Sequence, residues 1–122
     1  MRMYEYRAKI TRVVDGDTLK ALVDVGFNMH HDVTLRLFGI DCPETRTRNL
    51  EEKEKGFEAK DRVSDLLAAS NFEVNIKSHG VDKYGRCLAE VVSITPHGES
   101  KNINRILLEE GLAVDYYGGK KS

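Results

Sequence analysis

Several features that would mark this sequence as a special class are scarce or absent. It has only two cysteines, Cys42 and Cys87, which lack the spacing of metal ligands, so we expect two free thiols that pack as small side chains. No apolar run approaches the length of a membrane span, and residues 1–10 contain no apolar signal-peptide core. These absences predict a cytoplasmic protein, or alternatively a secreted mature form, that has no membrane partner.

The chain also lacks a strong excess of either charge. It has 19 lysines and arginines and 20 aspartates and glutamates, which give a net charge of -1. A protein that coats nucleic acid would be clearly basic, so this class is disfavoured. A nuclease is compatible with the balance, because an acidic metal site offsets basic residues elsewhere. The length and the absence of repeats or linkers predict one domain over residues 1–117, followed by a disordered tail at 118–122.

Period-two alternation of apolar and polar residues predicts five strands, at residues 4–14, 18–25, 32–40, 72–77 and 87–94. Residues 45–55 show no apolar periodicity, so we expect a solvated loop there. A helical pattern begins at Gly56, residues 78–86 read as a polar loop, and a short helix around residues 103–107 has Gly111 as its C-cap. Five strands with a helix between the third and fourth are typical of an OB-type Greek-key barrel.

The most informative stretch is residues 35–44, Leu-Arg-Leu-Phe-Gly-Ile-Asp-Cys-Pro-Glu. Arg36 lies on the third predicted strand, and Asp41 and Glu44 follow after a glycine and a proline break the ladder. An arginine fork fits a phosphate, and clustered carboxylates fit a hard cation such as calcium or magnesium. The stretch therefore indicates half of a metal-dependent phosphodiesterase site. The alternative is a surface strand whose charges are only solvated.

Three stretches resemble the staphylococcal nuclease (thermonuclease) family: Val-Asp-Gly-Asp-Thr at 14–18, residues 35–44, and Asp-Lys-Tyr-Gly-Arg at 82–86. Weaker similarities lie at 56–59 and 104–113. The resemblance implies an OB-type barrel and a calcium-dependent nuclease that hydrolyses DNA and RNA to 3′-phosphate and 5′-hydroxyl ends. It implies nucleic acid as the substrate, and we expect a monomer with no obligate protein partner.

By position, Asp17 and Asp41 resemble the family's two carboxylate metal ligands, and the backbone carbonyl of Cys42 the third protein ligand. The family usually has a threonine at that third position, and a backbone ligand should survive the change unless the thiol binds a softer metal. Arg36 and Arg86 resemble the paired phosphate clamps. Glu44 resembles the acid that orders or deprotonates the attacking water.

Four further residues are candidates for substrate binding. Tyr84 and one of Tyr116 or Tyr117 are placed to stack on a base or touch a terminal phosphate, or alternatively to pack on the barrel. Lys83 is an auxiliary phosphate contact. The same fold also occurs as a non-catalytic binding module for nucleic acid or protein, and this is the alternative function. Such a module is expected to lack some of the five charged site residues, all of which this chain retains.

Two departures from the family pattern affect these expectations. The loop after Glu44 is longer and more acidic than expected, and Glu51, Glu52 and Glu54 would repel a polyanion. The chain also ends soon after Tyr117, where the family usually adds a third helix. This second departure bears more on the tyrosine pocket and on stability than on the metal site.

Overall fold

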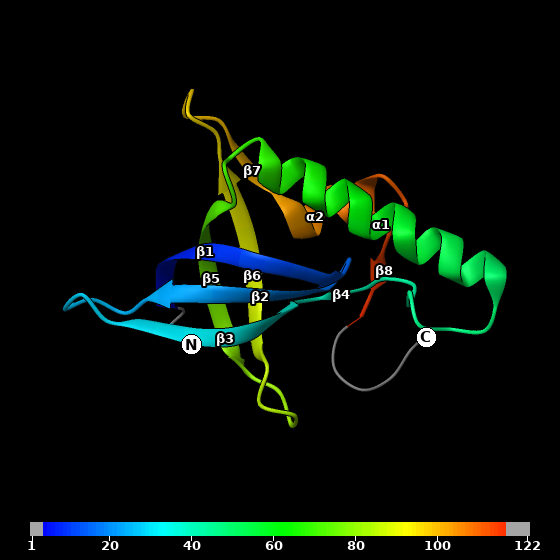
Figure 1. The fold of residues 1–122 in the computed structure, drawn as a ribbon, viewed down its shortest axis with the longest axis horizontal. Helices are drawn as coiled ribbons and strands as arrows, with labels where there is room; N and C mark the ends of the chain where they lie inside the picture. The colour runs from blue at the N-terminus through cyan, green and yellow to red at the C-terminus, as the bar shows by residue number, and fades with distance from the viewer. Residues whose placement is uncertain (1–3, 117–122) are drawn as a thin grey trace.

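The computed structural model describes residues 4–116, which form a strongly curved sheet with two helices on one side (Figure 1). Tyr117 and the tail predicted at 118–122 lie outside the described residues. The elements in chain order are β1 (Tyr4–Asp15), β2 (Thr18–Asp24), β3 (His30–Leu37), β4 (Ile40–Asp41), α1 (Leu50–Ala68), β5 (Glu73–Val81), β6 (Cys87–Ile94), β7 (Ser100–Asn102), α2 (Ile103–Glu109) and β8 (Val114–Asp115).

Five of the strands close into a barrel. Antiparallel pairing links β3 to β2, β2 to β1, β1 to β5 and β5 to β6, and a parallel pairing of Leu35–Leu37 with Cys87–Ala89 joins β3 to β6. In Figure 1, β1 to β3 run across β5 and β6, as expected when a twisted sheet curls onto itself. The predicted OB-type five-stranded barrel is thereby confirmed. The short strands β4, β7 and β8 were not predicted.

The barrel interior is filled by the inward-facing half of each alternating pattern. Leu19, Leu35, Leu37, Ile76 and Val91 are at most 1% exposed and belong to one continuous core. The outer layer is completed by α1, whose buried face consists of Gly56, Ala59, Val63, Leu66 and Leu67. Among the described residues, no helix combines the length and the apolarity needed to span a membrane. Both cysteines are free thiols, as expected.

The predicted start of the first helix was wrong. The helix α1 begins at Leu50, so most of the stretch assigned to a loop at 45–55 is helical. Its first turns are exposed and show no apolar stripe, but the Asn49 side chain caps the helix by accepting from the Glu52 amide at 3.2 Å. Glu51 and Glu52 add negative charge at the positive end of the helix dipole. The expected repulsion of a polyanion thus comes from a helix end rather than from a loop.

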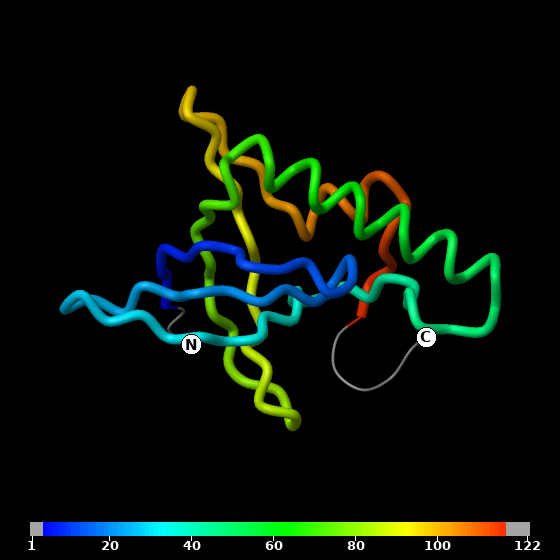
Figure 2. The backbone as a smooth tube through the Cα atoms, viewed as in Figure 1, coloured from blue at the N-terminus to red at the C-terminus, as the bar shows by residue number. Residues whose placement is uncertain are grey.

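Two predicted strand ends also differ from those in the structure. The third strand ends at Leu37 rather than at residue 40, because Gly39 turns the chain at φ +80° before Ile40 and Asp41 pair with β8. Strand β5 continues to Val81, past an irregularity between Ser78 and Gly80. Residues 78–81 of the predicted polar loop therefore belong to the strand. Figure 2 shows the resulting β5–β6 hairpin projecting well beyond the barrel.

Candidate functional site

The first predicted metal ligand, Asp17, lies in the tight turn between β1 and β2. Its side chain is buried, and its Oδ2 accepts from the Cys42 amide at 2.8 Å while its Oδ1 accepts from the Thr18 hydroxyl at 3.0 Å. Gly16 permits this turn to lie under α1, since a Cβ there would be 2.8 Å from the Ala59 Cβ. Glycine is therefore needed for close packing at this position.

Arg36 joins the two predicted carboxylate ligands. Its Nη1 lies 3.5 Å from Asp17 Oδ2, and its Nη2 lies 3.1 Å from Asp41 Oδ1. The same Nη1 donates to the carbonyl oxygens of Leu37 and Ile40 at 3.2 and 2.9 Å. The guanidinium is therefore fixed by the β3–β4 turn, and residues 24 positions apart in the chain meet at one arginine.

Two carboxylates and one guanidinium meet at this point. Burial raises the pKa of Asp17 and outweighs the lowering by Arg36 and by the Cys42 amide. The available donors are hard oxygens, which suit calcium or magnesium. In the described part of the chain no three acidic, thiol or imidazole side chains cluster, so the other ligands would be a carbonyl and water.

Cys42 contributes through its backbone. Its amide holds Asp17, and its side chain is buried. Burial and then the charge of Asp17 raise the pKa of the Cys42 thiol to about 12. The thiol is neutral near pH 7, which argues against the softer-metal role that a thiolate could have.

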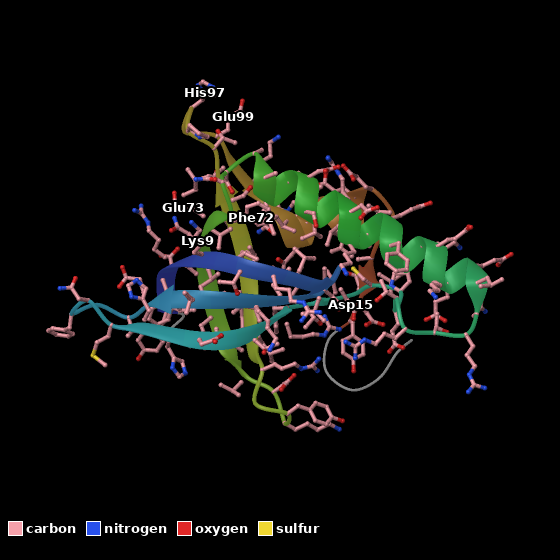
Figure 3. All side chains as sticks on the ribbon, viewed as in Figure 1. Lys9, Asp15, Phe72, Glu73, His97 and Glu99 are labelled. Atoms are coloured by element: carbon pink, nitrogen blue, oxygen red, sulfur yellow. The ribbon has the colours of Figure 1, made fainter. Side chains whose placement is uncertain are left out.

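Glu44 lies in the segment between β4 and α1 and is exposed. Within residues 4–116 its carboxylate makes no hydrogen bond or ion pair, and it does not line the main pocket. The backbone around it is fixed on two sides: Thr45 donates to Asp15 Oδ1 at 2.6 Å, and a Cβ on Gly56 would lie 2.7 Å from the Glu44 carbonyl oxygen. Figure 3 shows Asp15 at the end of the barrel that faces this segment.

Arg86, the second predicted clamp, lies at the base of the β5–β6 hairpin. Its Nε donates to Asp82 Oδ2 at 2.7 Å, and Asp82 Oδ1 accepts from the Tyr84 and Arg86 amides at 2.9 Å. Asp82 thus shapes the turn and aims the arginine. Sequence reasoning quoted this aspartate in the motif but gave it no role. The sequence feature that could have indicated this role is an aspartate at the start of a turn, where its side chain can accept from the amides of Tyr84 and Arg86.

One pocket of about 700 Å³ brings five of the ten predicted site residues together, without the three metal ligands or Glu44. Its lining includes Arg36 and Arg86 with Lys83, Tyr84 and Tyr116. Tyr84 is 71% exposed, and both the Lys83 and the Arg86 side chains lie over its ring, at 5.3 and 5.4 Å. Tyr116 lies 5.8 Å from the Arg36 guanidinium carbon, and its amide donates to the Gly39 carbonyl oxygen at 2.9 Å.

Phe38, also in this lining, was not singled out from the sequence. Its ring stacks on His79 with a centroid separation of 4.0 Å and an interplanar angle of 4°. The Nε2 of His79 is 2.8 Å from Glu90 Oε2. No motif in the sequence indicated the stacking of Phe38 on His79, because Phe38 directly follows β3, His79 lies on β5, and the two strands are not neighbours in the sheet order.

The closed barrel, its covering helices and a pocket lined by Arg36, Lys83 and Arg86 define an OB-type barrel with basic side chains gathered at one pocket. A family model described as "Staphylococcal nuclease homologue" matches residues 34–122, more than half of the chain. The chain belongs to the staphylococcal nuclease family, as the sequence motifs implied.

Three curated relatives are endonucleases or a thermonuclease by name. The chain is 36% identical over 105 residues to the SPbeta prophage-derived endonuclease YokF of Bacillus subtilis, covering 85% of this chain and 32% of that protein. It is 33% identical over 105 residues to endonuclease YncB of B. subtilis, covering 85% and 45%. It is 33% identical over 109 residues to the thermonuclease of Staphylococcus hyicus, covering 89% and 59%. The chain therefore spans less than two thirds of each relative.

Proposed function

We propose that this chain is a nuclease domain that hydrolyses phosphodiester bonds in DNA and RNA with the help of calcium, leaving 3′-phosphate and 5′-hydroxyl ends. The observation that carries the proposal is the position of Arg36, which contacts both Asp17 and Asp41 and lines the same pocket as Arg86. The names of the relatives support a nuclease. The site residues belong to a single chain, so we propose that the domain acts as a monomer without an obligate protein partner.

The two arginines have donors left for a phosphate. Hydrogen bonds within the described residues use both Nη1 hydrogens and one Nη2 hydrogen of Arg36, so two of its five donors are available. Arg86 uses its Nε for Asp82 and keeps both terminal nitrogens. Two fixed guanidinium groups neutralise the charge that builds up as water adds to the phosphorus, before any reorganisation is needed.

Asp17, Asp41 and the Cys42 carbonyl would hold the calcium ion. When bound, the ion would supply positive charge to a phosphate oxygen and to the attacking water. The meeting of the two aspartates at Arg36, at 3.5 and 3.1 Å, supports this role. The family resemblance assigns these ligands, and the geometry supports the two aspartates.

Glu44 is proposed to order or deprotonate the attacking water. The water oxygen forms a bond to phosphorus while the bond from phosphorus to the 5′ oxygen breaks, and a proton is delivered to that oxygen to give the 5′-hydroxyl. The phosphate stays on the 3′ oxygen. Glu44 has the exposure and the freedom from ion pairs within residues 4–116 that a water-binding carboxylate needs. Tyr84 and Lys83 are proposed to contact the substrate without reading its sequence.

The test is cleavage of single-stranded DNA and RNA by the purified protein with calcium and then with EDTA. Products are checked for a phosphatase-sensitive 3′ end. Arg36→Ala and Arg86→Ala should each lower kcat by two or more orders of magnitude, about 3 kcal/mol or more of transition-state stabilisation. Arg62→Ala is the matched control, because Arg62 pairs with Glu110 outside the pocket and should leave kcat unchanged.

The non-catalytic binding module is the outcome that would replace this proposal. It follows if folded protein binds nucleic acid but shows no calcium-dependent cleavage. A near-unchanged rate for either arginine variant would remove that arginine from the mechanism while leaving the nuclease in place.

A further inference from the structure

A second hollow lies on the outside of the barrel, away from the carboxylates. We call it the β5–β7 groove, and its charged lining consists of Lys77, Lys101, Arg105, Glu5 and Glu109. It has a volume of about 500 Å³ and also includes the amides Asn75 and Asn102. Nothing in the proposed nuclease mechanism uses these residues.

The cations of the groove have no acidic partner at ion-pair distance. Among residues 4–116, Lys77, Lys101 and Arg105 form no salt bridge within 4.0 Å, although Glu5 is directly opposite Lys77 in the β1–β5 register. Lys77 and Lys101 are half-buried. The lining itself holds three cations and two carboxylates, and a third carboxylate, Glu90, lies opposite Lys77 in the β5–β6 register.

A third hollow, of about 220 Å³, shares lining residues with both the β5–β7 groove and the main pocket. It is lined in part by Phe38, Gly39, Asn102 and Arg105. It shares Phe38 and Gly39 with the main pocket, and Asn102 and Arg105 with the β5–β7 groove. The three hollows therefore neighbour one another, in the order main pocket, β3–β4 turn and β5–β7 groove.

One carboxylate on this path, Glu90, is held by neighbours. His79 contacts its Oε2 at 2.8 Å, and Asn102 donates to its Oε1 at 3.4 Å. The hydrogen bond from His79 lowers the pKa of Glu90, with the nearby Lys77 adding to the effect. Glu90 therefore stays ionised, and its carboxylate is held by hydrogen bonds to β5 and to the N-cap of α2.

We propose that the β5–β7 groove is a second phosphate-binding subsite that holds the continuation of a single-stranded nucleic acid whose scissile phosphate lies at Arg36 and Arg86. The inference rests on the proposed function for the position of the scissile bond. The path bends around the barrel, and duplex DNA, with a persistence length of about 50 nm, does not follow such a surface. A single strand does, and three cations are placed to meet its successive phosphates.

The test compares two lengths of substrate. The triple variant Lys77→Ala, Lys101→Ala, Arg105→Ala and the unchanged protein are titrated into end-labelled single-stranded DNA of about 4 and about 20 nucleotides, in EDTA, by fluorescence anisotropy. For the longer strand, Kd should rise roughly tenfold, and the slope of log Kd against log salt should fall by about 2, since each contact to a single strand contributes about 0.7. Binding of the short strand should not change.

The matched control replaces three exposed cations on the outer face of β1 and β2: Lys9→Ala, Arg12→Ala and Lys20→Ala. Figure 3 shows Lys9 beside Glu73, its partner in the β1–β5 register. This variant removes the same charges and should leave Kd for both strands unchanged. Equal losses in the two variants would indicate long-range charge only and would overturn the subsite, as would equal losses for short and long strands.

Two further arms keep the outcome decisive. If the triple variant melts early, Lys101→Ala and Arg105→Ala are measured singly, with Lys101→Arg expected to restore binding; no length-dependent loss in either single variant rejects the subsite. Poly-glutamate that displaces the long strand at equal charge concentration would also reject nucleic acid as the occupant. Because binding is read in EDTA, a protein that never cleaves but shows the length-dependent loss retains the groove and loses only the proposed catalysis.

Discussion

Gly56 lies in the middle of α1 without a side chain, against the backbone of Pro43 and Glu44. An added Cβ would lie 2.7 Å from the Glu44 carbonyl oxygen and 2.9 Å from that of Pro43, and both contacts are with backbone atoms that cannot rotate away. A Cβ added to Gly16 would likewise lie too close to another residue, 2.8 Å from the Cβ of Ala59. At the residue scale, the position of Glu44, the proposed water-binding acid, therefore depends on the absence of a side chain at Gly56.

Gly56→Ala should destabilise the protein, although a glycine-to-alanine change inside a helix normally stabilises by about 0.5–1 kcal/mol. The clash with Glu44 makes the expected change a loss of about 1–3 kcal/mol in the free energy of unfolding, as for other overpacked sites. Urea denaturation measures it. Lys55→Ala, on the exposed face of the same helix, is the control and should change stability by less than about 0.5 kcal/mol. Equal or greater stability for Gly56→Ala would mean that the helix shifts freely over the loop.

At the scale of elements, the β5–β6 hairpin depends on Asp82. Burial raises the pKa of this carboxyl, but hydrogen bonds from the Arg86 amide, the Arg86 guanidinium and the Tyr84 amide outweigh burial and lower it overall. The ionised group therefore stabilises the folded state above its unfolded pKa of about 3.9. That contribution is lost as the pH falls through the lower folded value.

Asp82→Asn should cost about 1–2 kcal/mol of unfolding free energy at pH 7, because a charge-assisted bond to Arg86 is lost. The difference from the unchanged protein should be constant between about pH 5 and 7 and shrink below about pH 4. Urea unfolding at a series of pH values measures both. Asp24→Asn, on the exposed β2 strand end, is the comparison. A cost that does not change with pH would show that the aspartate acts by shape rather than by charge.

The β2–β3 turn is the second hairpin with an informative backbone. Phe27 and Asn28 both have positive φ, +56° and +58°, and the Met29 amide donates to the Gly26 carbonyl oxygen at 2.9 Å, as in a type I′ turn. Phe27 is 96% exposed, so its ring gains little packing to offset a conformation that bulky residues avoid.

Phe27→Gly should therefore raise the free energy of unfolding by about 0.5–1 kcal/mol, because glycine adopts positive φ without a Cβ penalty. Phe27→Ala keeps the Cβ and is the control, with no gain expected. Thermal and urea unfolding of the two variants distinguish relief of the backbone from removal of an exposed ring. A gain of the same size in Phe27→Ala would assign the effect to the ring.

The sequence predicted the barrel strands because their alternation reflects one buried face and one exposed face. It misplaced the start of α1, where Asn49 and two glutamates begin the helix before any apolar stripe appears. It also missed β4 and β8, which are two residues each and exist through pairing with one another. Local patterns report burial well, but they report poorly on a cap or on a strand that forms only by tertiary contact.

At the scale of the whole molecule, the motif residues were found in the sequence, but their partners were not. The predicted convergence of Asp17, Asp41 and Arg36 matches the geometry, and Arg86 lines the same pocket. The links from Thr45 to Asp15 and from His79 to Phe38 were invisible, because each joins distant segments through side chains that are common on any surface. The roles proposed for all the site residues stay predictions, and Tyr117 lies outside the described residues.

Binding of calcium to the folded molecule should be detectable without any substrate. At a calcium concentration about 100-fold above Kd, the folded state gains about 2.7 kcal/mol, and the melting temperature should rise by several degrees. Asp17→Asn and Asp41→Asn should each abolish most of this shift. Glu54→Gln, on exposed α1, should keep it. The same rise in all variants would mean that calcium binds elsewhere.

The parallel contact between β3 and β6 brings together segments about 50 residues apart, and the two clamp arginines lie at this seam. A nascent chain that has emerged only as far as α1 already contains Asp17, Arg36 and Asp41, but it lacks the second guanidinium and the strand that seals the barrel. The complete pair exists only after the last large strand has docked. A fragment released by premature termination or by proteolysis between α1 and β5 therefore lacks Arg86, and the proposed nuclease activity should begin only with a finished barrel.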